Sequence, residues 1–180
     1  MTAGRKDGFA VWLTGLPSSG KSAIAGQLQR LLAERGIYAQ LLDSDELRNQ
    51  LTPHPAYSDA ERKWFYEVMV FIAALLTRNG VPVIIAATGS RREYRDGARS
   101  HLPRFAEIHI DCPAKVCRQR DPKGLWRRAE KGEISALPGA GIRYEAPLAP
   151  ELSVDSSVTS IDEAARHILG CLRQKGFIPA

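Results

Sequence analysis

Short apolar runs alternate along the chain with longer segments whose apolar residues recur at helical spacing. The apolar runs predict strands over 9–14, 38–43, 81–88 and 106–111, and a fifth, less apolar run predicts one over 151–156. The helical spacing predicts helices near 21–35, 59–79, 91–100, 113–120 and 160–175. Such alternation is typical of a parallel sheet with helices on both faces. The pattern therefore predicts an α/β fold with ligands at the carboxyl ends of the strands.

The 180 residues are the length of one domain, so we expect residues 1–180 to form a single folded unit. Segment 121–150 differs from the rest because it is rich in Gly, Pro and charge and has no clear strand pattern. We expect this segment to be a mobile lid over a ligand.

The loop between the first strand and the first helix reads 15-GLPSSGKS-22, which is the complete G-x-x-x-x-G-K-S pattern. Its glycines allow backbone N–H groups to face phosphate oxygens, and the helix that follows adds the positive end of its dipole. The residues expected to hold the phosphates of a nucleoside triphosphate are Gly15, Ser18, Ser19, Gly20, Lys21 and Ser22. In this pattern Lys21 reaches the β and γ phosphates, and the Ser22 hydroxyl binds Mg²⁺.

Two carboxylates, Asp43 and Asp45, follow the second strand and are expected beside the phosphate loop. Phosphoryl transfer needs a carboxylate that positions or deprotonates the acceptor hydroxyl and one that holds metal-bound water, and this spacing allows each residue one role. The competing interpretation is structural, with Ser44 or Asp45 capping a short helix over 46–51. The two interpretations are compatible, and the pattern does not say which carboxylate has which role.

Arginine dominates the formal charge of +5, with clusters over 91–99 and 118–132. Three interpretations apply: solvated helix faces, nucleic-acid binding, or a site that handles several phosphates. Because the clusters lie downstream of a phosphate loop, where a kinase has its lid, we prefer the phosphate site and expect no nucleic-acid partner. Trp126, inside the second cluster, could stack on a base, but we expect it to pack the lid.

The composition restricts the setting in which the protein works. No apolar run approaches the ~18 residues of a membrane span, and the N-terminus lacks the apolar region of a signal peptide. The three cysteines, Cys112, Cys117 and Cys171, form no C-x-x-C pair and are expected to be reduced core thiols. We therefore expect a cytoplasmic protein without a membrane partner.

Four segments together resemble the adenylylsulfate kinase (APS kinase) family: 15-GLPSSGKS-22, 42-LDSDELR-48, 117-CRQRDPKGLWRRAEKGEI-134 and 144-YEAPLAPEL-152. The resemblance extends over about residues 9–175. It implies a P-loop kinase fold with a five-stranded parallel sheet, ATP and Mg²⁺ as cofactors, and a homodimer. It also implies transfer of the γ-phosphate of ATP to the 3′-hydroxyl of adenosine 5′-phosphosulfate, which gives PAPS.

The same resemblance implies roles for individual residues. It assigns the anionic group of the acceptor to Arg48 and Arg62, base stacking to Tyr57, and a lid contact with the substrate to Lys123. It gives Asp43 and Asp45 the metal and hydroxyl roles, and makes Ser22 and Asp43 the metal-binding pair. The catalytic residues are then Lys21, Asp43 and Asp45.

The departures from the family pattern fall on the acceptor side. Leu137 stands where the family has a second aromatic residue for the base, and Phe65 stands where it has an amide that touches the acceptor, so the resemblance implies that both residues bind the substrate. In the loop over 88–92, which begins with the expected acceptor-side residue Thr88, Gly89 replaces a serine and Ser90 is displaced from it by one position. Three alternatives follow: a divergent APS kinase, a kinase of the same fold acting on another anionic and possibly nucleotide-linked metabolite, or a non-catalytic nucleotide-binding regulatory protein.

Overall fold

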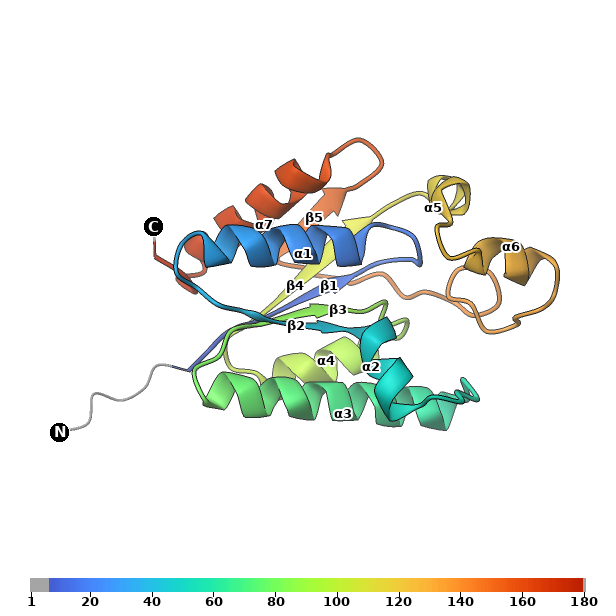
Figure 1. The fold of residues 1–180 in the computed structure, drawn as a ribbon, viewed down its shortest axis with the longest axis horizontal. Helices are drawn as coiled ribbons and strands as arrows, with labels where there is room; N and C mark the ends of the chain where they lie inside the picture. The colour runs from blue at the N-terminus through green and yellow to red at the C-terminus, as the bar shows by residue number, and fades with distance from the viewer. Residues whose placement is uncertain (1–6, 180) are drawn as a thin grey trace.

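A computed structural model describes residues 7–179 of the protein. It contains one sheet of five strands in the order β2-β3-β1-β4-β5 (Figure 1). The strands are β1 (Ala10–Thr14), β2 (Gln40–Asp43), β3 (Val83–Ala86), β4 (Phe105–Asp111) and β5 (Leu152–Asp155). Every pairing between neighbouring strands is parallel. The predicted α/β fold with a five-stranded parallel sheet is confirmed.

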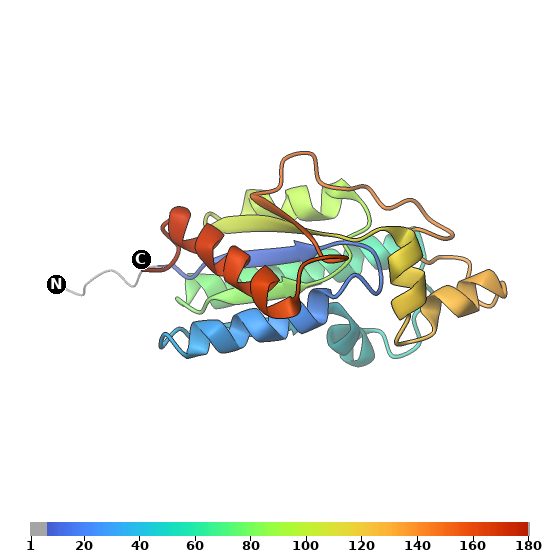
Figure 2. The same cartoon turned by 90° about the horizontal axis from the view of Figure 1, so that it is seen from above.

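Helices cover both faces of the sheet, with α1 and α7 on one face and α3 and α4 on the other (Figures 1 and 2). The helices are α1 (Lys21–Ala33), α2 (Ser44–Leu51), α3 (Asp59–Arg78), α4 (Arg92–His101), α5 (Ala114–Arg120), α6 (Leu125–Glu130) and α7 (Ile161–Gln174). Helix α6 was not predicted, because it is only six residues long and lies in a segment rich in Gly, Pro and charge.

The central strand β1 contributes to two separate cores because its alternate side chains point to opposite faces of the sheet. Val11 and Leu13 pack in the core beneath α1 and α7, whereas Ala10 and Trp12 pack in the core beneath α3 and α4. All five residues of β1 are buried, which explains why the strand reads as a continuous apolar run.

The carboxyl ends of the strands face the end of the molecule that carries α2, α5 and α6 (Figure 1). A third, smaller apolar cluster of Cys112, Cys117, Trp126 and Leu137 anchors segment 121–150 there. Within residues 7–179, no helix combines the length and the apolar character needed to cross a membrane.

Candidate active site

The phosphate loop joins β1 to α1 at the carboxyl edge of the sheet. Gly15 is required there because a Cβ at this position would lie 2.3 Å from the carbonyl oxygen of Ile110 on β4. Gly20 precedes α1 in the left-handed conformation, and no side chain of the described residues caps the N-terminus of this helix. Its first N–H groups and the positive end of its dipole are therefore available to an anion.

Lys21 lies inside this loop. Its Nζ donates hydrogen bonds to the carbonyl oxygens of Gly15, at 3.0 Å, and Leu16, at 2.7 Å. Burial lowers the pKa of Lys21 to about 8, although the carboxylate of Asp45 acts in the opposite direction. A phosphate in the loop would replace the lost solvation and favour the charged amine.

Asp43, at the end of β2, makes two contacts that fix the start of α2. Its carboxylate accepts the hydroxyl of Ser22 at 2.6 Å and the backbone N–H of Asp45 at 2.9 Å. The helix cap is therefore Asp43, and not Ser44 or Asp45 as the competing interpretation predicted. Helix α2 correspondingly begins at Ser44, two residues before the predicted start at residue 46.

The pair formed by Ser22 and Asp43 suits a hard cation such as Mg²⁺. A hydroxyl and a carboxylate 2.6 Å apart offer two oxygen donors beside the phosphate loop. Mg²⁺ is usually held by one or two protein oxygens together with substrate phosphates and water, so a larger protein ligand set is not required. The described residues contain no cluster of three or more His, Cys, Asp or Glu side chains that could hold a metal ion.

Segment 121–150 reaches back over the loop through two side chains. Lys123 Nζ forms an ion pair with Asp45, which raises the pKa of the lysine. Trp126 is buried, and its indole N–H donates to the carbonyl oxygen of Pro17 at 3.1 Å. The expectation that Trp126 packs the lid is confirmed, and the sequence-predicted residues Lys123 and Asp45 are in direct contact.

One large cavity, of about 1210 Å³, joins the phosphate loop to the inner surface of segment 121–150. Predicted site residues that line it are Ser18, Ser19, Gly20, Lys21, Ser22, Asp45, Arg48, Tyr57, Arg62, Thr88, Lys123 and Leu137. This volume exceeds that of a typical pocket for one small molecule, so it suits two nucleotide-sized ligands.

Arg48, Tyr57 and Arg62 form the part of this cavity that belongs to α2, α3 and the loop between them. The Arg62 side chain is buried and donates to the carbonyl oxygens of Tyr57, at 3.0 Å, and Ala136, at 2.7 Å. The guanidinium groups of Arg48 and Arg62 lie 5.1 and 5.2 Å from the ring centre of Tyr57. Two cations and an aromatic ring thus meet where the anionic acceptor is expected.

The two departures Leu137 and Phe65 are placed differently. Leu137 is among the residues that line the cavity and is otherwise buried in the third apolar cluster, so this position supplies no aromatic ring to the ligand space. Phe65 is fully buried in the core beneath α3 and is not among the residues that line the cavity. The prediction that Phe65 touches the acceptor is therefore wrong in its direct form, because Arg48 lies between its ring and the cavity.

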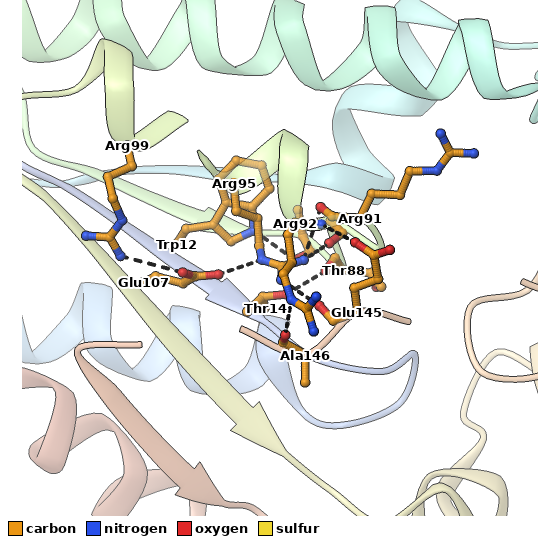
Figure 3. Close-up of polar contacts among 12 residues, drawn as sticks. Trp12, Thr14, Thr88, Arg91, Arg92, Arg95, Arg99, Glu107, Glu145 and Ala146 are labelled. Atoms are coloured by element: carbon orange, nitrogen blue, oxygen red, sulfur yellow. Dashed lines mark hydrogen bonds and ion pairs between the residues drawn. The ribbon is translucent and has the colours of Figure 1, made fainter. Parts of the chain in front are cut away.

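The third departure, Gly89, lies in a loop that the buried Arg95 holds in place. Figure 3 shows Arg95 among its polar partners. Arg95, from α4, forms an ion pair with Glu107 of β4, with 2.5 Å between Nε and Oε1. The same guanidinium donates to the carbonyl oxygens of Gly89 and Glu145, which ties the 88–91 loop to the 144–147 strap. Ser90 is buried in this arrangement and cannot offer its hydroxyl to the cavity in place of the missing serine.

Sequence reasoning missed several cavity residues. Tyr66 lines the cavity, and its hydroxyl accepts the N–H of Gly89 at 3.1 Å. Ser156 and Thr159 line it from the connection between β5 and α7, and Ile161 lines it from the first position of α7. The alternation of elements could have indicated this connection, since it follows the carboxyl end of a strand in the same parallel sheet.

Comparison with known proteins gives a consistent result. Residues 7–155 match the family model described as adenylylsulphate kinase. A probable adenylyl-sulfate kinase from Pyrococcus abyssi is 37% identical, and the alignment covers 96% of this chain and 99% of the relative. An adenylyl-sulfate kinase from Shewanella sp. is 38% identical over 93% of this chain and 83% of its own length.

A solved structure extends the similarity to three dimensions. The APS kinase of Mycobacterium tuberculosis in complex with AMPPNP and APS has a TM-score of 0.88 and 36% identity, over 93% of this chain and 98% of that chain. The matched range, residues 7–155, contains the loop, the carboxylates and the arginines described above, and on this sequence and fold the chain belongs to the adenylylsulphate kinase family.

Proposed function

We propose that this protein transfers the γ-phosphate of ATP to the 3′-hydroxyl of adenosine 5′-phosphosulfate and releases ADP and PAPS. The observation that carries the proposal is that one cavity contains both the phosphate loop and the Arg48, Tyr57 and Arg62 cluster. The loop suits a triphosphate donor, and the cluster suits an anionic acceptor with an aromatic base. The similar Mycobacterium tuberculosis enzyme was solved with AMPPNP and APS together, which supports the same pair of ligands here.

The contacts of the two carboxylates support a division of their roles. Asp43 is bonded to Ser22, so it is suited to the shell of a metal ion beside the loop. Asp45 lines the cavity, so it is suited to accept the proton of the acceptor hydroxyl as that oxygen bonds to the γ phosphorus. The bond from the γ phosphorus to the β–γ bridging oxygen breaks in the same step.

Lys21 and Lys123 supply positive charge on the donor side. Lys21 lies within the loop, and Lys123 approaches from the segment that covers it. Both are placed to neutralise charge that builds on the γ-phosphate oxygens in the transition state. Ser22 and Asp43 would hold Mg²⁺, which would supply further positive charge to neutralise the phosphates.

The proposal is tested by a coupled assay of ADP release with Mg·ATP and APS, repeated with Lys21→Ala. Turnover with APS that is lost in the variant supports the proposal. Arg48→Ala should raise the KM for APS and leave the KM for ATP within about twofold, because Arg48 lines the acceptor part of the cavity. Equal effects on both KM values would assign Arg48 to the donor instead.

A different acceptor is the second candidate, and one observation favours it. Leu137 lines the cavity but has no aromatic ring. Of the two positions that the resemblance assigned to base stacking, only Tyr57 is therefore aromatic. Loss of one stacking face is worth ~1–3 kcal/mol per base, which would weaken selection for adenine. A panel of other nucleotide-linked and sulfated or phosphorylated acceptors in the same assay tests this candidate directly.

The proposal includes a homodimer. Trp64, Phe71 and Leu75 are exposed on the outer side of α3, and exposed apolar patches commonly mark interaction sites. Among the similar proteins, an APS kinase from Thiobacillus denitrificans is described as hexameric, and this chain spans 30% of its length. Sedimentation velocity at micromolar concentration would show a dimer, and a monomer at all concentrations would contradict it.

A further inference from the structure

The guanidinium group of Arg48 rests on the face of the Phe65 ring, with 3.9 Å between Cζ and the ring centre. Phe65 is fully buried, and the side chain of Arg48 is 11% exposed. The Phe65 ring is itself held edge-on by Tyr66, with ring centres 5.5 Å apart and planes at 75°. A fixed aromatic surface therefore lies beneath a cation that lines the cavity.

Hydrogen bonds within the protein do not account for the position of this guanidinium. The Nη1 atom of Arg48 is buried and has no hydrogen-bond partner among residues 7–179. It forms an ion pair with Oε1 of Glu61, but the 3.7 Å between the two atoms is too long for a hydrogen bond, and Oε1 also has no hydrogen-bond partner within the described chain. The other oxygen of Glu61 accepts the N–H of Tyr57 at 2.7 Å, which keeps this carboxylate in place.

We infer that Phe65 is a positioning residue for the acceptor: its ring face seats the guanidinium of Arg48 so that the N–H groups stay available to the anionic group of the ligand. This inference rests on the proposed function, because it takes the acceptor as the ligand of Arg48. A partly desolvated cation over an aromatic ring favours the bound geometry by about 5- to 30-fold in an equilibrium constant. Because the ring already holds the Arg48 side chain in place, less side-chain entropy is lost when the acceptor binds.

The first test is Phe65→Leu, which retains an apolar side chain in the core but removes the ring face. We expect the KM for APS to rise about 5- to 30-fold, while the KM for ATP and kcat at saturating APS change less than twofold. A general loss of packing would not separate the two substrates in this way. Equal changes in both KM values would overturn the inference.

Phe105→Leu is the matched control. Phe105 is a buried phenylalanine with the Arg99 guanidinium 5.1 Å from its ring centre, and it does not line the cavity. The control removes the same kind of contact elsewhere in the fold, so it should leave the KM for APS within twofold of the wild type. A KM increase as large as that of Phe65→Leu would overturn the inference.

The second test asks whether Phe65 acts through Arg48. Phe65→Leu should have little further effect on the KM for APS when Arg48 is already Ala, since the ring then has no guanidinium to position. The same 5- to 30-fold increase in that background would show that Phe65 acts by another route and would overturn the inference.

The contact between Arg48 and Phe65 can also be tested without a substrate, so that an error in this inference is distinguished from an error in the proposed function. If the wild type does not turn over APS, the proposed function is wrong. Urea unfolding of the single and double variants of Arg48 and Phe65 then tests the contact between the two side chains by itself. Non-additive effects on stability support contact between the two side chains, and additive effects overturn it.

Discussion

Replacing Gly89 by alanine should destabilise the fold through two separable effects. The residue has a φ of +51°, and a Cβ would lie 3.0 Å from Cζ2 of Trp12 and 3.2 Å from Cγ of Arg95. The left-handed conformation costs a non-glycine residue ~1–2 kcal/mol. Crowding in a packed core costs ~1–3 kcal/mol more, and the lower entropy of the unfolded chain returns ~0.4–1 kcal/mol. The expected net loss is therefore about 1–5 kcal/mol.

Crowding at Gly89 is difficult to relieve because its neighbours are fixed. Trp12 is fully buried, and its indole donates to the carbonyl oxygen of Ala87 at 3.0 Å. Arg95 is paired with Glu107 and cannot move without leaving that carboxylate. The same two effects apply to Gly89→Ser. A serine at this position would therefore supply a hydroxyl but would also destabilise the fold.

Gly36→Ala is the matched control for this prediction. Gly36 has a φ of +72°, but nothing lies within 4 Å of the position of its Cβ. It should therefore lose only the conformational part, about 0.5–1 kcal/mol after the gain in the unfolded state. Urea unfolding followed by circular dichroism measures both values. If the two variants lose the same free energy within 0.5 kcal/mol, crowding at Gly89 is absent and the reasoning is refuted.

Three further predictions concern the active site and its support. Lys21→Ala should reduce kcat by orders of magnitude with an unchanged circular dichroism spectrum, and near-normal turnover would contradict the loop assignment. Because burial lowers the pKa of Lys21 to about 8, the free enzyme loses this charge as the pH rises through 8. The kcat/KM for ATP should then fall above pH 8, and a flat profile up to pH 10 would contradict this. Arg95→Met should lower the free energy of unfolding in urea by about 3–5 kcal/mol, since it leaves Glu107 buried without its main partner. A loss below 1 kcal/mol would show that Arg99, which also pairs with Glu107, compensates fully.

The sequence predicted the sheet and the donor half of the site because both depend on local patterns. Five apolar runs of strand length produced the five strands, and the G-x-x-x-x-G-K-S spacing placed Lys21 and Ser22 in the loop between β1 and α1. Helix α6 escaped prediction because six residues are too few to show a helical period.

The acceptor half was harder to predict because it depends on contacts between distant segments. The carbonyl oxygen of Ala136 accepts a hydrogen bond from Arg62, 74 positions earlier in the chain. Phe65 was predicted to touch the acceptor, but the turn of α3 points its ring into the core under Arg48. The sequence identifies which positions depart from the family pattern, and only the packing shows which of them face the ligand.

The central claim is that phosphate moves from ATP to the 3′-hydroxyl of APS, and the product itself is the most direct test. The protein is incubated with Mg·ATP and APS, and the nucleotide product is isolated and identified by mass spectrometry and ³¹P NMR. The account predicts one new phosphate ester on the 3′-oxygen, formed in equal amount to ADP and absent with Lys21→Ala. ADP without a phosphorylated APS product, or a phosphate at another position, would contradict it.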